Sequence, residues 1–174
     1  MTKNESLRTA APATTAAPAP ALPAGVVHTT AQGAERVSDA PGSVMALLAD
    51  VAGLTCNLAV LEEGAKGAPV HHHTKATEFF FVLDGRLDVL VEEEILTLAK
   101  GDFLAVPAHV KHAFAPAAGA RAEVFVGFAP GMGRFDYYRL LDRVRAGQAD
   151  PAEIGASSPV YDNHYGESAL WAGR

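Results

Sequence analysis

Short apolar segments separated by turn residues follow one another through the middle of the chain. Several of them alternate apolar and polar positions, and they are rich in the β-branched and aromatic residues that favour strands. No helical pattern alternates with them, so the sequence predicts an all-β domain of the sandwich or barrel kind. The expected strands are residues 26–30, 44–49, 54–61, 70–73, 78–83, 86–91, 95–99, 103–106, 110–114 and 121–128.

The pattern changes after residues 130–133, where Pro and Gly interrupt it. Residues 135–144 carry apolar side chains at helical intervals, and Gly147 follows, which predicts a short helix after the barrel. Its aromatic face would pack across an open end of the barrel, or the helix would simply cover the outer sheet. The final segment, residues 151–174, contains Tyr161, His164, Tyr165 and Trp171, a group suited to capping a pocket or to a dimer interface.

The two ends of the chain complete the expected domain organisation. Residues 1–25 are rich in Ala and Pro without a continuous apolar core, so we expect a disordered tail and not a secretory signal. A barrel over 26–130 and a helix with a capping segment over 131–174 would follow. Residues 44–61 form the longest weakly polar run, but Asp50 and Asn57 interrupt it, which favours two strands over a membrane span.

Charge and cysteine content narrow the possible partners. The formal net charge of −6 over 174 residues argues against nucleic-acid binding, which requires a Lys- and Arg-rich surface. The single cysteine, Cys56, has no internal disulfide partner and fits a reducing compartment. We therefore expect a cytoplasmic protein with no membrane or nucleic-acid partner.

Four side chains stand out by their spacing: His71, His73, Glu78 and His112. Three imidazoles and a carboxylate form a mixed nitrogen and oxygen donor set that suits a divalent transition metal. In an extended strand His71 and His73 project to the same face, whereas His72 projects to the other and would face solvent. The joint spacing of these residues predicts a metal site with these four ligands.

The remaining residues around the site are placed by the same alternation. Residues 74–77 would turn the chain back as a hairpin, which would bring Glu78 onto the strand next to the histidine pair. Phe80 and Val82 share the parity of Glu78, and Phe114 shares that of His112. These three apolar residues are the expected lining and substrate contacts, and His109 is expected at the rim.

The ligand segments resemble the two signature motifs of the cupin superfamily, small β-barrels that hold a metal inside. The first motif, Gly67-x3-His71-x-His73-x4-Glu78-x6-Gly85, is matched at every position. The second is matched at Gly101, Pro107 and His112, but His109 replaces a usual glycine and Pro116 a frequent asparagine. The resemblance covers residues 44–130. It implies a single-domain jelly-roll barrel (a double-stranded β-helix), a short C-terminal helix, one divalent ion (Fe, Mn, Ni, Co, Cu or Zn) and a homodimer.

Among cupins, the chain is most similar to small bacterial proteins of the quercetin dioxygenase type. That resemblance implies a metal-dependent dioxygenase acting on a small aromatic or enolic substrate, flavonol-like or polyketide-like, with Glu78 accepting the substrate's proton. The alternatives are a non-redox cyclase, isomerase or decarboxylase of natural-product biosynthesis, and a module that binds a small ligand without turnover. The sequence has no glycine-rich phosphate loop and no nucleophile elbow, which argues against kinases, nucleotide-binding oxidoreductases and serine hydrolases.

Overall fold

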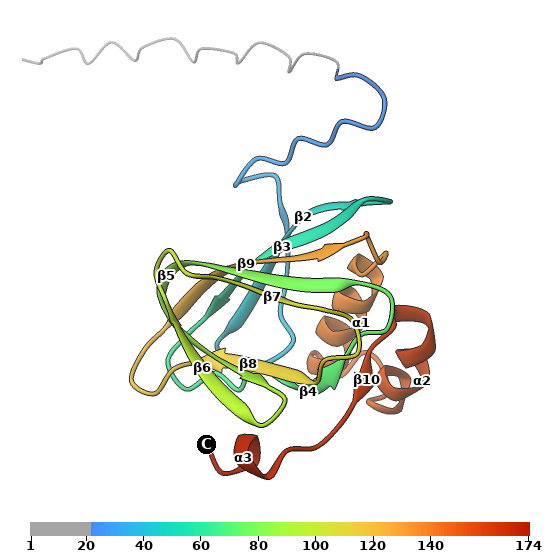
Figure 1. Ribbon diagram of the computed structural model, residues 1–174. Coiled ribbons are helices and arrows are strands. Elements are labelled where there is room, and N and C mark those ends of the chain that lie inside the picture. The colour runs from blue at the N-terminus through green and yellow to red at the C-terminus, as the bar shows by residue number, and fades with distance from the viewer. Residues whose placement is uncertain (1–21) are drawn as a thin grey trace, which may run out of the picture.

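The computed structural model describes residues 22–174, which form a mostly β structure with helices near the C-terminus (Figure 1). The expected tail, residues 1–25, lies almost wholly outside this range. The strands are β1 Glu35–Val37, β2 Ser43–Val51, β3 Leu54–Leu61, β4 Ala68–His72, β5 Thr77–Val91, β6 Glu94–Ala99, β7 Phe103–Val106, β8 His112–Pro116, β9 Ala122–Ala129 and β10 His164–Tyr165. The helices are α1 Phe135–Arg145, α2 Ala152–Tyr161 and α3 Ala169–Ala172.

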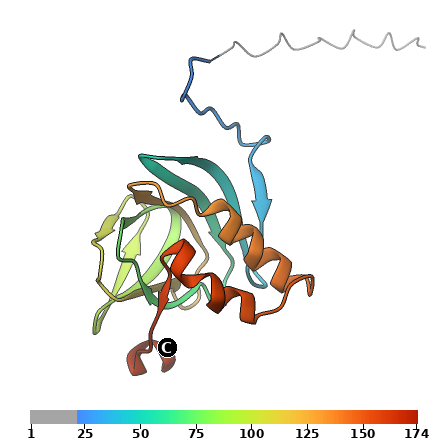
Figure 2. The ribbon, with the colours of Figure 1, turned by 90° about the vertical axis from the view of Figure 1, so that its right-hand side faces the viewer.

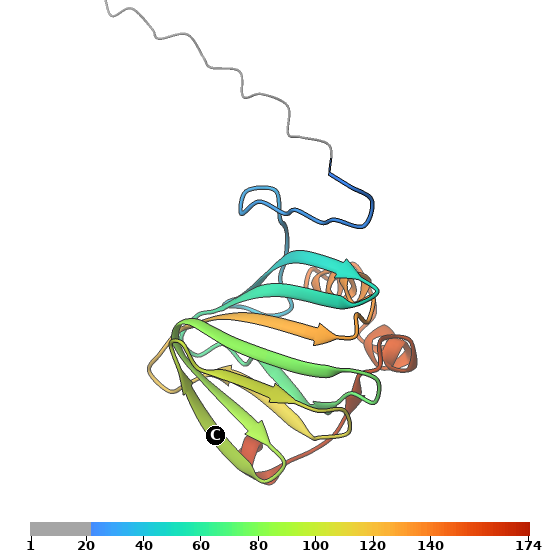
Figure 3. The same ribbon diagram turned by 45° about the horizontal axis from the view of Figure 1, so that its top comes forward.

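The strands form two antiparallel layers that share the long strand β5. Its first half pairs with β9 and β7, and its second half pairs with β6 and β8. The strand path runs β1-β2-β3-β9-β5-β8-β4-β10 (Figure 3). The core lies between the layers, where side chains such as Leu87 and Val89 from one half of β5 meet Val124 and Val126 from β9. This arrangement is the jelly roll that the cupin resemblance implies.

Two details of the expected barrel are wrong. The hydrogen-bonded sheet does not close on itself, because β1 and β10 end the strand path without pairing with each other in the described residues. Residues 74–77 do not make a hairpin either, because β4 pairs with β8 and β10 and not with β5. Glu78 therefore approaches the histidines from the opposite layer. The connecting segment crosses between the layers instead of returning along its own sheet.

Most of the expected strands are present at nearly the expected positions. The segment 26–30 is an exception, since it has no strand, and the first strand is instead β1. Residues 78–83 and 86–91 belong to one continuous strand, because Asp84 and Gly85 remain paired with β9 while the chain bends from one layer to the other. Gly85 allows this bend: its φ is +75°, and a Cβ there would lie 1.9 Å from the carbonyl oxygen of Arg121.

Helices α1 and α2 lie at one side of the strands, whereas the short helix α3 lies apart from them at the bottom of the view (Figure 2). Helix α1 is the predicted helix, and its buried residues include Tyr137, Tyr138 and Leu140. Helix α2 and strand β10 were not predicted; β10 extends the layer beyond β4, where His164 pairs with His72. No helix in residues 22–174 is long and apolar enough to span a membrane.

The turn before β8 explains one departure from the cupin motif. His109 occupies the position where the family usually has glycine, and its φ is +70°, a left-handed conformation that glycine adopts without steric cost. Its backbone N–H donates to the carbonyl oxygen of His73 over 2.6 Å, and its side chain is exposed. The backbone at His109 thus keeps the conformation that a glycine would adopt, although a residue with a side chain is strained in it.

We expect His109→Gly to stabilise the protein by up to ~1 kcal/mol in urea unfolding at fixed metal loading. Relief of a left-handed conformation that costs about 1–2 kcal/mol outweighs the extra backbone entropy of glycine, about 0.5–1 kcal/mol. Ala108→Gly, in the same turn but without a positive φ, is the matched control and should destabilise. Equal effects of the two substitutions would show that the His109 backbone is not strained.

Candidate metal centre

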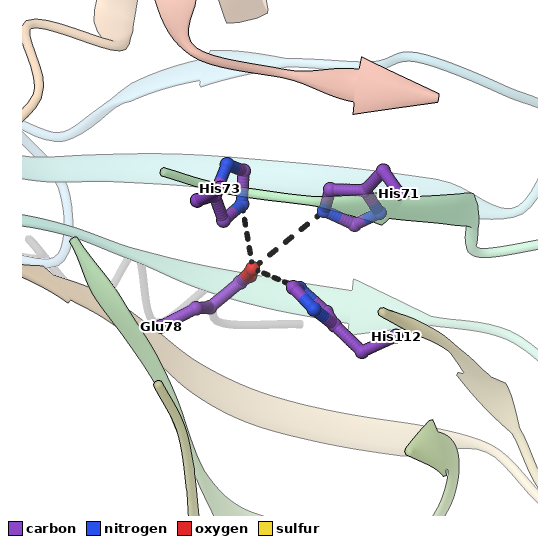
Figure 4. Close-up of side chains that lie close together, drawn as sticks. All are labelled: His71, His73, Glu78 and His112. Atoms are coloured by element: carbon purple, nitrogen blue, oxygen red, sulfur yellow. Dashed lines mark hydrogen bonds and ion pairs between the residues drawn. The ribbon is translucent and has the colours of Figure 1, made fainter. Parts of the chain in front are cut away.

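Three imidazoles converge on one carboxylate oxygen in the interior of the barrel (Figure 4). The Nε2 atoms of His112, His73 and His71 lie 2.7, 3.0 and 3.6 Å from Oε2 of Glu78. One donor atom from each residue falls within 4.8 Å of all the others, and all four residues are buried. The structure therefore brings together the four residues that the sequence singles out.

Both layers of the jelly roll contribute to this cluster. His71 on β4 lies directly opposite His112 on β8 in the antiparallel ladder, so their side chains share a face. Glu78 reaches the histidines from the first half of β5 in the other layer, where its neighbours are Val106 and Phe128. His73 follows the end of β4. His72, between His71 and His73 in the chain, points away from the cluster, as its parity predicts. Its ring is partly exposed and stacks on that of His164, with centroids 5.0 Å apart.

The second nitrogen of each imidazole fixes the orientation of its ring. Nδ1 of His71 donates to the carbonyl oxygen of Pro69 over 2.8 Å. Nδ1 of His73 donates to the carbonyl oxygen of Asp162 over 2.6 Å, and Nδ1 of His112 donates to that of Val110 over 2.9 Å. A carbonyl oxygen only accepts, so each Nδ1 carries a hydrogen and each neutral ring presents an Nε2 lone pair to the centre. Such backbone partners are typical of histidines that bind a metal through Nε2.

The charges of the cluster support the same interpretation. Burial lowers the pKa of His71 to about 4, so this ring is neutral at pH 7 and its Nε2 lone pair faces the Glu78 carboxylate. Burial raises the pKa of Glu78, but its contacts with His112, His71 and His73 outweigh this and lower the pKa well below the ordinary value. Burial lowers the pKa of His112, but the contact with Glu78 is stronger and raises it.

A divalent cation fits this arrangement of donors. Lone pairs of neutral imidazoles and an ionised carboxylate repel one another when they converge in a buried site without a cation or protons between them. A cation among the four atoms would replace this repulsion with attraction, and it would compete with protons for the same lone pairs. His71, His73, Glu78 and His112 are therefore the residues that would hold the ion.

A cavity of about 70 Å³ lies between the layers beside this cluster, and His71 and Glu78 form part of its wall. Phe114, an expected lining residue, also lines it. Phe80 is fully buried and packs edge-on against the rings of Phe114 and His112, and Val82 is fully buried in the core; neither is among the residues that line the cavity. Contact of Phe80 or Val82 with a substrate remains a prediction.

Helix α1 and the C-terminal segment close the cavity on the remaining side. Tyr137, Tyr138 and Leu141 of α1 line it, so the helix covers the open end of the barrel, which was one of the two expected arrangements. Asn163, between α2 and β10, also lines it, whereas none of the aromatic and histidine residues singled out in this segment does, namely Tyr161, His164, Tyr165 and Trp171.

Sequence reasoning missed the polar groups on this side, namely Asp39, Asn57, Arg134 and Asn163. Arg134 stands between the Pro- and Gly-containing residues 130–133 and the expected helix, and nothing in this local position indicates a buried cation. The positions of Asp39 and Asn163 depend on packing between distant segments.

Asp162 anchors the turn that carries His73. Its carbonyl oxygen accepts from Nδ1 of His73, and its carboxylate accepts from the backbone N–H groups of Thr74 and Lys75 and from the Thr74 hydroxyl, over 2.8, 2.9 and 2.6 Å. Burial raises the pKa of Asp162, but these hydrogen bonds and that of His164 outweigh it and lower the pKa to about 2.

We expect Asp162→Asn to destabilise the protein by about 1–3 kcal/mol at pH 6, because hydrogen bonds to a charged acceptor are lost. The pKa of Asp162 is lower in the folded than in the unfolded chain. The ionised carboxylate therefore makes its full contribution to stability above pH 4, and this contribution disappears as the pH falls towards 2. Urea unfolding at pH 6, 4 and 3 should show that the difference in free energy of unfolding between wild type and variant becomes smaller as the pH falls. A difference that does not depend on pH would contradict this role.

Comparison with known proteins agrees with the fold and the motif. The family model described as Cupin domain matches residues 57–128, which include all four converging residues. No curated protein matches the chain in sequence.

Among solved structures, an RmlC-like cupin from Shewanella frigidimarina is 24% identical, with a TM-score of 0.55 over 63% of this chain and 93% of that one. The structure titled FeII HppE is 21% identical, with a TM-score of 0.54 over 62% of each chain. The polyketide cyclase RemF from Streptomyces resistomycificus is 13% identical, with a TM-score of 0.51 over 60% of this chain and 79% of that one. These likenesses show the fold. The family match places a cupin domain at residues 57–128 of this chain.

Proposed function

We propose that this protein is a metal-dependent dioxygenase that acts on a small aromatic or enolic substrate. The observation that carries the proposal is the position of the four-donor cluster, since His71 and Glu78 belong both to the cluster and to the cavity wall. A substrate oxygen in the cavity would thus lie next to the ion that these residues hold. A purely structural metal site would be closed to a ligand.

A bound divalent ion would supply Lewis-acid activation of a substrate oxygen and, for a redox-active metal, reaction with dioxygen. Glu78 would take up the proton of the substrate's hydroxyl group. The three histidines converge on its Oε2, whereas Oε1 accepts no hydrogen bond from the described residues. In a dioxygenase reaction both atoms of dioxygen enter the product, so no external reductant is required.

The cavity walls would position the substrate and exclude water. Met45, Ala59, Leu61 and Val126 provide an apolar surface next to the polar groups of the site. The free volume of about 70 Å³ is smaller than a cavity of about 150 Å³ that accommodates benzene. An aromatic ring would therefore require movement of side chains in the wall, which favours a substrate smaller than a flavonol.

The second candidate is a non-redox cyclase, isomerase or decarboxylase acting on an enolisable substrate. The same donor set would serve it, because Lewis-acid activation and proton transfer require no change in the oxidation state of the ion. The structural likeness to a polyketide cyclase and to an Fe(II) protein indicates that this fold hosts more than one chemistry.

Oxygen consumption distinguishes the two candidates. The protein is stripped of metal and reloaded separately with Fe, Mn, Co, Ni, Cu and Zn, and each form is incubated with a panel of small catechols and enols. A dioxygenase consumes oxygen with a redox-active ion but not with Zn, and both atoms of oxygen-18-labelled dioxygen enter its product. Conversion without air, or by the Zn form, would establish the non-redox reaction. Binding without conversion under any condition would contradict both and indicate a ligand-binding module.

The predicted homodimer is a further proposal that accompanies this function. Sedimentation velocity of the metal-loaded protein would test it, and a single species of monomer mass would contradict it.

A further inference from the structure

Arg134 is a buried cation at the cavity, between β9 and α1. It is only 3% exposed, and its guanidinium carbon lies 4.7 Å from the ring centroid of Phe128 and 4.9 Å from that of Tyr137. Nη1 donates to the carbonyl oxygen of Tyr161 over 3.1 Å, and Nη2 donates to Oδ1 of Asn163 over 3.3 Å. All these partners are neutral groups.

The positive charge of Arg134 lacks a paired carboxylate. Within residues 22–174 no acidic side chain forms an ion pair with it, and its Nε is buried without a hydrogen-bond partner. The other buried side-chain atom without a partner is Oδ1 of Asp39, and both residues line the same cavity. A buried charge without an ionic partner is costly, so an additional ligand would stabilise this arrangement.

The surroundings of the cavity favour an anionic ligand. A divalent ion bound by three neutral imidazoles and one carboxylate would leave a positive charge at the cluster, and Arg134 adds a second one. Burial raises the pKa of Tyr138 to about 12, so this neighbouring phenol is neutral and does not compensate Arg134. Asp39 supplies one negative charge in the same wall, which leaves the metal-loaded cavity positive.

We propose that Arg134 is a specificity-determining residue that binds an anionic oxygen of the substrate, a carboxylate or an ionised phenol, while another substrate oxygen reaches the metal cluster. A hydroxyl group of the same substrate would donate to Asp39. The planar guanidinium suits a carboxylate, to which it donates more than one hydrogen bond. The reaction of the bound substrate rests on the proposed function, but its binding is measured without turnover.

Arg134 also has a plainer role, because it joins the end of α2 to the barrel through Tyr161 and Asn163. A purely structural Arg134 would affect stability and would change the affinity for charged and neutral ligands alike. Discrimination between an anion and a neutral molecule of the same shape is therefore the informative quantity.

The test compares benzoate with benzamide, and acetate with acetamide, by calorimetric titration of metal-free and Zn-loaded protein. Wild type should bind the anion about tenfold to a hundredfold more tightly than the amide in at least one pair, as expected for charge-assisted hydrogen bonds. Arg134→Met should bring this ratio close to one in both metal states, and Arg134→Lys should retain part of it. Arg139→Met, a partly exposed position on α1, is the control and should leave the ratio unchanged.

Three results would overturn the proposal. Wild type could show no preference for the anion in either pair, or no binding of any probe. The preference could persist in Arg134→Met. Finally, wild type could lose its preference for the anion when zinc is removed, while zinc-loaded Arg134→Met keeps that preference. This result would show that the ion, and not Arg134, selects the anion. None of these results depends on turnover, so they are distinguishable from failure of the proposed function.

Discussion

His112→Ala is expected to lower the affinity of the protein for a divalent transition metal at least a hundredfold. Structural zinc sites in small peptides contribute about 10–16 kcal/mol, and the same scale divided over four ligands assigns about 3 kcal/mol to each of them. The loss should be large because the substitution also leaves Glu78 without its nearest partner, 2.7 Å away. Competition titration with a chromophoric chelator measures the change.

His72→Ala is the matched control for this substitution. His72 lies between two of the four residues in the chain, but its ring is partly exposed and stacks on His164 away from the cluster. Its removal should change metal affinity little. Equal losses in the two variants would show that the chain binds metal through exposed histidines and not through the buried cluster.

Glu78→Gln is expected to lower turnover about a hundredfold to ten-thousandfold under saturating metal, the range typical of general acid–base catalysis. Glutamine preserves the shape of the side chain and an oxygen that can reach the ion, but it does not accept the substrate's proton. The low pKa of Glu78 means that its carboxylate is ionised at pH 7 and available as the base.

Metal content is determined in the same samples, so that a loss of the ion is not mistaken for a loss of the base. A Glu78→Gln protein that retains one ion and full turnover would show that another group takes up the proton. A variant that loses its ion even at saturating metal is compared with His112→Ala. If the two variants hold the same amount of metal and Glu78→Gln turns over more slowly than His112→Ala, the carboxylate still has a catalytic role.

Local patterns in the sequence predicted most of the sheet and the cluster. Alternation along 54–61 and 103–106 gave β3 and β7 at their observed bounds, and parity separated His72 from its two neighbours. These predictions succeeded because strand geometry fixes the face of each side chain within a few residues. The four residues of the cluster were identifiable because their spacing reflects that geometry.

Features that depend on distant segments were not predictable in this way. The route of the chain after His73 was wrong because residues 74–77 make no hairpin and are held by Asp162, far away in the sequence. Arg134 was missed because its partners Tyr161 and Asn163 reach it only after α2 folds back. The segment 26–30 has apolar residues but no partner strand, and propensity alone does not form a strand.

Anomalous diffraction from crystals of the metal-loaded protein, recorded on both sides of the absorption edge of the ion, tests the central claim most directly. We predict one strong peak per chain, within bonding distance of Nε2 of His71, His73 and His112 and of a Glu78 carboxylate oxygen. A fully loaded protein with no peak among these four atoms, or with its ion at the partly exposed His72 and His164 pair, would contradict the account.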